Sequence, residues 1–197
     1  LGNFSIGNYF KSEAIEFACE LLFDEKWFGF DQDKLYITYY SEDSETKSLW
    51  MSHGIKEDYL IPLDGNFWEI GEGPCGPDTE MFIDRGYEPC SENCDPSCDC
   101  GKYLEIWNNV FMEFFKDEKG NYSKLKQHNV DTGMGLERVL CISNGYGKRE
   151  LERQIDSMLF ERTMISTTKN KNLIEQNPAV GLLRDSYVLE FLDVPKD

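Results

Sequence analysis

Eight residues, DTGMGLER from Asp131 to Arg138, place two carboxylates, two glycines and one arginine close together. Gly133 and Gly135 let a ligand or another backbone approach closely, and a helix beginning near them would offer free N–H groups to an anion. Arg138 would lie one turn into that helix, where its guanidinium can pair with a phosphate or stack on a flat ring. Asp131 would lie at a strand end and could accept hydrogen bonds from an ammonium group. The same spacing also fits a glycine-rich turn from strand to helix with an internal ion pair, so both interpretations stay open.

A lone amide, Asn108, lies in an apolar row of a long predicted strand, YLEIWNNVFMEFF. Side chains alternate between the two faces of a strand. One face would carry Ile106, Asn108, Val110 and Met112. The other would carry Glu105, Trp107, Asn109 and Phe111. Asn108 fits either an amide bonded to nearby backbone or a small apolar pocket in which one amide orients a polar ligand.

The segment DGNFWEIGEGPCGPDTEMFIDRG is the densest in chemically useful residues. Trp68 could place an indole N–H in a site, and GPCGP is predicted to be a rigid turn that aims the following strand. Glu80 and Asp84 would share one face of that strand, an arrangement that can hold Mg²⁺ through carboxylates. A solvated acidic face is the alternative.

The loop CSENCDPSCDC contains four of the seven cysteines of the chain: Cys90, Cys94, Cys98 and Cys100. An odd cysteine count without a secretion signal favours reduced thiols or a metal over disulfides. Four sulfurs in so short a loop could enclose a tetrahedral Zn²⁺ with bonds of about 2.3 Å. Reduced thiols without a metal are the alternative.

The elements that must position these residues alternate between helix and strand. Helices are predicted over residues 12–23 and over SEDSETKSLWMSHG, where the second would be capped and end at Gly54. Strands are predicted over residues 35–40, 80–84 and 103–115, with a hairpin turn at 117–121. After Asp131 the pattern becomes helical, and the segment from residue 150 is helix-like. The pattern indicates an α+β domain over residues 1–147 and a helical segment of open role over residues 148–197.

Composition limits the partners of the chain. Of its 197 residues, 40% are hydrophobic, which suffices for one well-packed domain. Its 20 basic and 37 acidic residues give a net charge of −17, so this segment alone should bind RNA weakly. We found neither an apolar run long enough for a bilayer nor a signal peptide pattern, so we expect a cytoplasmic chain without membrane partners.

Several long stretches together resemble one family. LGNFSIGNYFKSEAIEFACELL, NFWEIGEGPCGPDTEMFIDRG, YLEIWNNVFMEFF and VDTGMGLERVL are similar, in the same order, to the catalytic domain of the alanyl-tRNA synthetases. The resemblance covers about residues 1–147 and implies the class II fold, an antiparallel sheet flanked by helices. It also implies that alanine is joined to ATP as alanyl-adenylate with Mg²⁺ and then esterified to tRNA(Ala).

The resemblance also assigns roles to individual residues. DTGMGLER looks like the third signature motif of the class, so Arg138 would stack on adenine and neutralise ATP phosphates. Asp131 would accept the alanine ammonium, and Trp68 and Asn108 would line the pocket. Val110 and Gly133 would form the wall around the methyl group.

The chain departs from the family at both ends. The first motif and most of the second would lie upstream of residue 1, so the class II sheet is expected to be incomplete and the chain to be a fragment of a longer protein. Nothing in it resembles the family's editing domain with histidine metal ligands. Two other hypotheses stay open: a stand-alone relative that activates a small amino acid for another acceptor, and a non-catalytic relative that binds a partner or ligand. The joint presence of Trp68, Asn108, Asp131 and Arg138 argues against the second.

Overall fold

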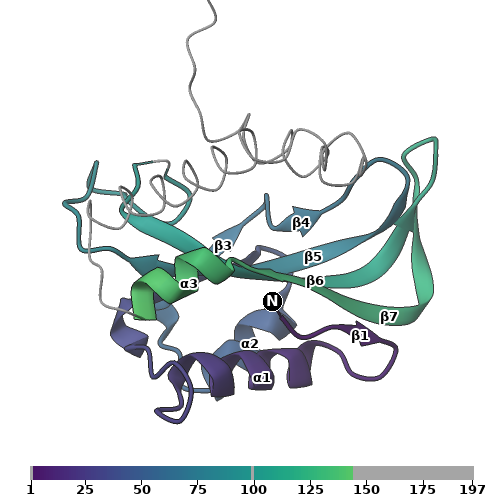
Figure 1. Ribbon diagram of the computed structural model, residues 1–197. Helices are drawn as coiled ribbons and strands as arrows, with labels where there is room; N and C mark the ends of the chain where they lie inside the picture. The colour runs from purple at the N-terminus through teal and green to yellow at the C-terminus, as the bar shows by residue number, and fades with distance from the viewer. Residues whose placement is uncertain (1, 99, 144–197) are drawn as a thin grey trace, which may run out of the picture. The chain divides into compact units, whose positions relative to one another are not determined.

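A largely antiparallel sheet dominates the structure, a computed structural model that describes residues 2–98 and 100–143 (Figure 1). Its strands are β1 (Ser5–Ile6), β2 (Leu35–Tyr40), β3 (Leu60–Leu63), β4 (Phe67–Trp68), β5 (Gly73–Asp84), β6 (Tyr103–Lys116) and β7 (Tyr122–Met134). Their order is β1-β7-β6-β5-β2-β3, and β4 pairs with β5 beside this path. Among the described strands, β2 and β3 pair in parallel and the other pairs are antiparallel. The predicted α+β class with an antiparallel sheet is confirmed.

Two helices, α1 (Lys11–Phe23) and α2 (Ser44–Ser52), cover one face of the sheet (Figure 1). α1 buries apolar residues at helical spacing: Ala14, Ile15, Ala18 and Leu22. α2 begins after Asp43, whose carboxylate accepts a hydrogen bond from the backbone N–H of Thr46 at 3.1 Å. Both predicted helices are therefore confirmed. Short 3-10 turns at Gln32–Lys34 and Glu57–Tyr59 precede β2 and β3.

The core lies between these helices and the sheet. Trp50 of α2 is fully buried and donates its indole N–H to the hydroxyl of Thr79 on β5 at 3.0 Å. Trp107 and Phe111 of β6 fill the same layer. Because this face of the sheet is filled by side chains, a ligand site on the sheet has to use the opposite face.

Strand β5 begins seven residues earlier than predicted. The GPCGP segment is not a turn before the strand but its first part, with a register shift against β6 between Cys75 and Asp78. The lack of a side chain at Gly76 allows this segment to pair with β6, because a Cβ there would lie 2.0 Å from the carbonyl oxygen of Phe111 on β6. Glycine thus allows two strands to approach closely, and the irregular register accommodates prolines that a regular ladder excludes.

Strands β6 and β7 form a long hairpin. β6 matches its predicted range, and the carboxylate of Asp117 accepts backbone N–H groups of Lys119 and Asn121 in the predicted turn. β7 extends through Asp131 to Met134, so the prediction of helix directly after Asp131 is wrong by several residues. The helix α3 (Leu136–Ser143) begins only after Gly135.

The predicted boundary near residue 147 and the helical segment 148–197 lie outside the described residues. Within the described part, no helix is both long and apolar enough to cross a bilayer.

Candidate functional site

Three neighbouring strands present polar side chains on the sheet face opposite α1 and α2. In this register Val110 lies between Asp78 and Asp131, and Asn108 lies between Glu80 and Gly133. Directly paired residues of antiparallel strands point to the same face, so these side chains form two adjacent rows. The sheet thereby brings together four of the predicted site residues: Asn108, Val110, Asp131 and Gly133.

Asp78 and Asn66, which sequence reasoning missed, form the buried floor of this face. Both are at most 5% exposed. The Asn66 amide donates to Asp78 at 2.7 Å, to the hydroxyl of Thr38 at 3.0 Å and to Glu80 at 3.2 Å. Thr38 donates in turn to Glu80 at 3.1 Å. Asp78 stands two residues before Glu80, so strand alternation could have placed it on this face had β5 been extended to it.

Asn108 offers an unused acceptor at this floor. Its amide nitrogen lies 3.5 Å from a carboxylate oxygen of Asp78. Its side-chain oxygen is buried and has no hydrogen-bond partner within the described residues. A buried amide oxygen without a donor is costly, so this atom favours a ligand that brings an N–H or O–H group.

Asp131 and Trp68 border the same face from different elements. Asp131 is half-buried, and one of its oxygens accepts the backbone N–H of Thr132 at 2.8 Å. Trp68 pairs with Gly76 through β4, which lies on the side of the sheet away from α1 and α2 (Figure 1). The half-buried Trp68 therefore stands close in the chain to Asn66 and opposite the start of the strand that carries Asp78.

Arg138 joins this face through Glu105. Its guanidinium donates to the Glu105 carbonyl at 2.8 Å and lies 3.4 Å from the Glu105 carboxylate. A register shift leaves Ile106 without a partner on β5, because Met81 pairs with Trp107 and Phe82 with Glu105. The bulge moves Glu105 to the same face as Asn108, so the predicted alternation of this strand is wrong at that point.

Comparison with known proteins identifies the family. A family model described as tRNA synthetases class II (A) matches residues 1–182. The chain belongs to this family. It is 49% identical over 155 residues to the alanine–tRNA ligase of Treponema denticola, covering 74% of this chain and 26% of that protein. It is 52% identical over 147 residues to that of Halalkalibacterium halodurans, covering 72% and 17%.

A third relative matches a larger share of the chain. The alanine–tRNA ligase of Levilactobacillus brevis is 46% identical over 168 residues, which is 83% of this chain and 19% of that protein. The resemblance to alanyl-tRNA synthetases is thereby confirmed. The chain spans about a quarter or less of the length of these relatives.

Glu80 and Asp84, the predicted Mg²⁺ ligands of this synthetase chain, have different surroundings. Glu80 belongs to the buried floor described above. Asp84 forms an ion pair with Lys102, whose ammonium lies 2.9 Å from both carboxylate oxygens. The predicted pair is therefore on one strand, but only Glu80 lies among the polar residues around Asn108.

The polar face of this class II synthetase chain is strongly anionic. The carboxylates of Asp78, Glu80, Glu105 and Asp131 share it. Burial raises the pKa of Asp78 to about 7, and the charges of Glu80 and Glu105 act in the same direction. Burial and the charge of Glu105 also raise the pKa of Glu80. A bound cation would relieve both effects, so the face favours ammonium groups and metal ions.

Asp78 makes stability depend on pH. Its pKa in the folded chain, about 7, exceeds its ordinary value of 3.8, so the folded state binds the proton more tightly than the unfolded state. The stabilisation that this tighter proton binding provides is complete when the pH is below the ordinary pKa, and it is lost as the pH rises through 7. We expect Asp78→Asn to change the free energy of unfolding differently at the two ends of this range. The change should favour the folded state by roughly 2 to 4 kcal/mol more at pH 8 than at pH 4.

Urea unfolding at both pH values, in the absence of substrates, measures this difference. Asp58→Asn, which makes the same change at an exposed position, is the control and should show no such difference. A pH-independent effect of Asp78→Asn would contradict the assignment of a raised pKa to Asp78.

Proposed function

We propose that this chain supplies the alanine-binding part of an alanine–tRNA ligase. The intact protein joins alanine to ATP to form alanyl-adenylate and then transfers the alanyl group to tRNA(Ala). The observation that carries the proposal is the buried side-chain oxygen of Asn108, which has no hydrogen-bond partner within the described residues and lies in the row next to that of Asp131 on an anionic face. The alanine–tRNA ligases to which the chain is about 50% identical supply the choice of amino acid and acceptor.

Alanine would bind across the two rows, beside Asp131 and Val110 of one row and Asn108 of the other. The ammonium group pairs with Asp131, and the Asn108 oxygen accepts one of its N–H bonds. Val110 and Gly133 bound the methyl group, with the Trp68 indole closing the pocket from β4. The carboxylates of Asp78 and Glu80 add negative potential that favours the ammonium end of the zwitterion.

ATP would bind on the side of Arg138. Its guanidinium exchanges its contact with Glu105 for the adenine ring and the phosphates, which planar, delocalised cations bind well. The alanine carboxylate then attacks the α-phosphorus and pyrophosphate leaves. Such a displacement needs positioning and charge neutralisation rather than a protein nucleophile.

Mg²⁺ would neutralise the phosphates during this step, with Glu80 as its carboxylate ligand on the polar face. Asp84, the second candidate ligand, would first have to leave Lys102. Glu80 fits the ion better, because it lies among the polar residues around Asn108, where burial and the charge of Glu105 raise its pKa and a bound cation would offset both.

The acceptor tRNA(Ala) would be bound mainly by other parts of the intact protein. With a charge of −17, this chain repels phosphates at long range. We also place the protein in the cytoplasm, where the six described cysteines, all of them free, would remain reduced.

Pyrophosphate exchange on the intact gene product tests the proposal. With ATP and Mg²⁺, we expect exchange with alanine to exceed that with glycine by roughly 10- to 200-fold in kcat/KM, the range that one methyl group provides. Serine should be rejected less strongly, because an apolar pocket discriminates poorly against an added hydroxyl. Addition of tRNA(Ala) should then yield alanyl-tRNA.

Each other result has a definite meaning. Exchange with alanine but no transfer to tRNA(Ala) would indicate a stand-alone relative with another acceptor. An intact protein that exchanges with none of the three amino acids would contradict the proposal and favour a non-catalytic binding module.

A further inference from the structure

The loop between β5 and β6 is closed at its neck by hydrogen bonds. The backbone N–H of Arg85 donates to the carbonyl of Lys102 at 2.9 Å, and its guanidinium donates to the carbonyl of Gly101 at 3.0 Å. The ammonium of Lys102 bridges Asp84 and the carbonyl of Tyr87, each at 2.9 Å. The loop is therefore anchored at both ends, although it contains no helix or strand in its described residues.

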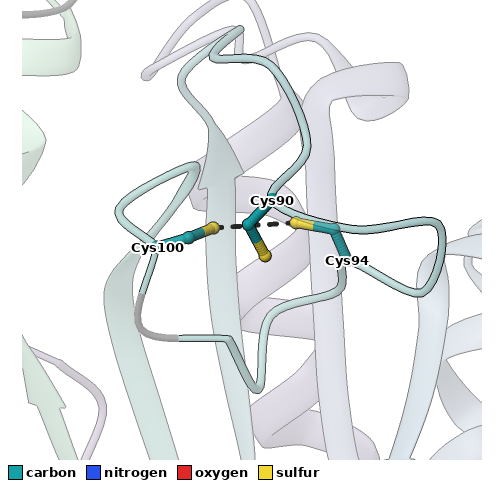
Figure 2. A group of neighbouring side chains, drawn as sticks. All are labelled: Cys90, Cys94 and Cys100. Carbon is teal, nitrogen blue, oxygen red and sulfur yellow. Dashed lines mark hydrogen bonds between the residues drawn. The ribbon is translucent and has the colours of Figure 1, made fainter.

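Three thiols from distant positions in this loop converge at its centre (Figure 2). The sulfurs of Cys90, Cys94 and Cys100 all lie within 4.8 Å of one another. Those of Cys94 and Cys100 are 3.6 Å apart, too far for a disulfide bond of about 2.05 Å. In a tetrahedron with Zn–S bonds of about 2.3 Å, neighbouring sulfurs are about 3.8 Å apart. The observed spacing suits a shared metal ion.

Two tight turns position Cys94 and Cys98 in the loop. The backbone N–H of Cys94 donates to the carbonyl of Ser91 at 3.3 Å, and that of Cys98 donates to the carbonyl of Asp95 at 3.0 Å. The Asp95 carboxylate accepts the backbone N–H of Ser97 at 2.8 Å, which fixes the second turn. Backbone hydrogen bonds, rather than a buried apolar cluster, thus hold the thiols near one another.

Cys98 lies in the same loop, two residues before Cys100, and can supply a fourth sulfur. Zinc binds such cysteines as thiolates, and its charge offsets the repulsion between neighbouring thiolates.

We propose that Cys90, Cys94 and Cys100, with Cys98 as fourth ligand, form a structural zinc site that closes the β5–β6 loop. Four sulfur ligands leave no open coordination position, which is the arrangement of structural rather than catalytic zinc. Lys102 and Arg85 at the neck place positive charge near the anionic complex. The ion stiffens the start of β6, two residues before Glu105, and so supports the contact between Glu105 and Arg138. The proposal does not depend on the activity proposed above.

Alkylation of the individual cysteines tests the zinc site in the intact protein. Zinc-loaded and chelator-treated samples, both kept under reducing conditions, are exposed to iodoacetamide, and the modified peptides are quantified by mass spectrometry. We expect zinc to slow modification of the four loop cysteines by at least about tenfold, because a coordinated thiolate is a poor nucleophile. The readout is specific to each cysteine, so a metal bound elsewhere in the intact protein does not affect it.

Matched variants connect the protection to a bound ion. Cys94→Ser and Cys100→Ser should each lower the zinc content by one equivalent per chain, and Cys98→Ser should do the same. Cys19→Ala, which removes a thiol buried in α1, should retain all of it. Equal alkylation rates with and without zinc, or an unchanged zinc content in Cys94→Ser, would overturn the proposal. Full zinc content in Cys98→Ser would overturn the assignment of the fourth ligand.

Discussion

Asp131→Asn is expected to lower kcat/KM for alanine in pyrophosphate exchange by about 100- to 1,000-fold. The substitution removes the charge that pairs with the ammonium group, and leaving a desolvated cation without its partner typically costs about 3 to 4 kcal/mol. Stability should change little, because an asparagine oxygen can still accept the backbone N–H of Thr132 that Asp131 accepts at 2.8 Å. Most of the effect should appear in KM for alanine.

Measurement of initial exchange rates across alanine concentrations, at saturating ATP, separates KM from kcat. Asp58→Asn provides the control, since it makes the same chemical change on an exposed carboxylate. If Asp131→Asn stayed within threefold of the wild type, the ammonium group would have to lie elsewhere. Asp78, which lies across Val110 from Asp131, would then be the next candidate to test.

Strong local patterns predicted most of the elements. The helical spacing of Ala14, Ile15 and Ala18 and the long alternation of β6 both depend on neighbours in the sequence, so they can be recognised without tertiary information. The first part of β7 was missed because Leu125 is the one apolar residue of the segment 123–129, so the sequence shows no apolar alternation there. Its pairing with β6, a tertiary feature, makes it a strand.

The site was predicted in part for a related reason. Asn108 and Asp131 stand out by type and by resemblance, and the sheet register then places them on one face. Asp78 and Asn66 could not be found, because their burial depends on the irregular start of β5 and on β4 folding over the sheet. Glu105 was assigned to the wrong face, since a single-residue bulge at Ile106 reverses the alternation and leaves no signal in the sequence.

The irregular start of β5 makes a second strong prediction possible. Gly76→Ala should destabilise the protein by at least about 3 kcal/mol, because the new methyl group would overlap the backbone of β6. The nearest atoms to that Cβ are the carbonyl oxygen of Phe111 at 2.0 Å and the amide nitrogen of Glu113 at 3.0 Å. Neither can rotate away, so β5 and β6 must separate beside Asp78. Denaturant unfolding measures the loss, and a decrease below about 1 kcal/mol would contradict so close an approach.

Gly133→Ala makes the same chemical change on β7 and should have the opposite consequence. Within residues 2–98 and 100–143, no atom lies within 4 Å of a Cβ at this position, and the backbone of Gly133 does not need positive φ. Alanine should therefore leave stability within about 0.5 kcal/mol of the wild type, since it adds no clash and restricts the unfolded chain. The methyl group would instead enter the space proposed for the methyl group of the substrate. We expect KM for alanine to rise by about tenfold or more while KM for glycine changes less, because glycine has no methyl group to be displaced. A variant that is stable and equally impaired with both amino acids would place Gly133 away from the methyl group. A rise in KM for alanine alone would identify Gly133 as the wall that sets the size of the pocket.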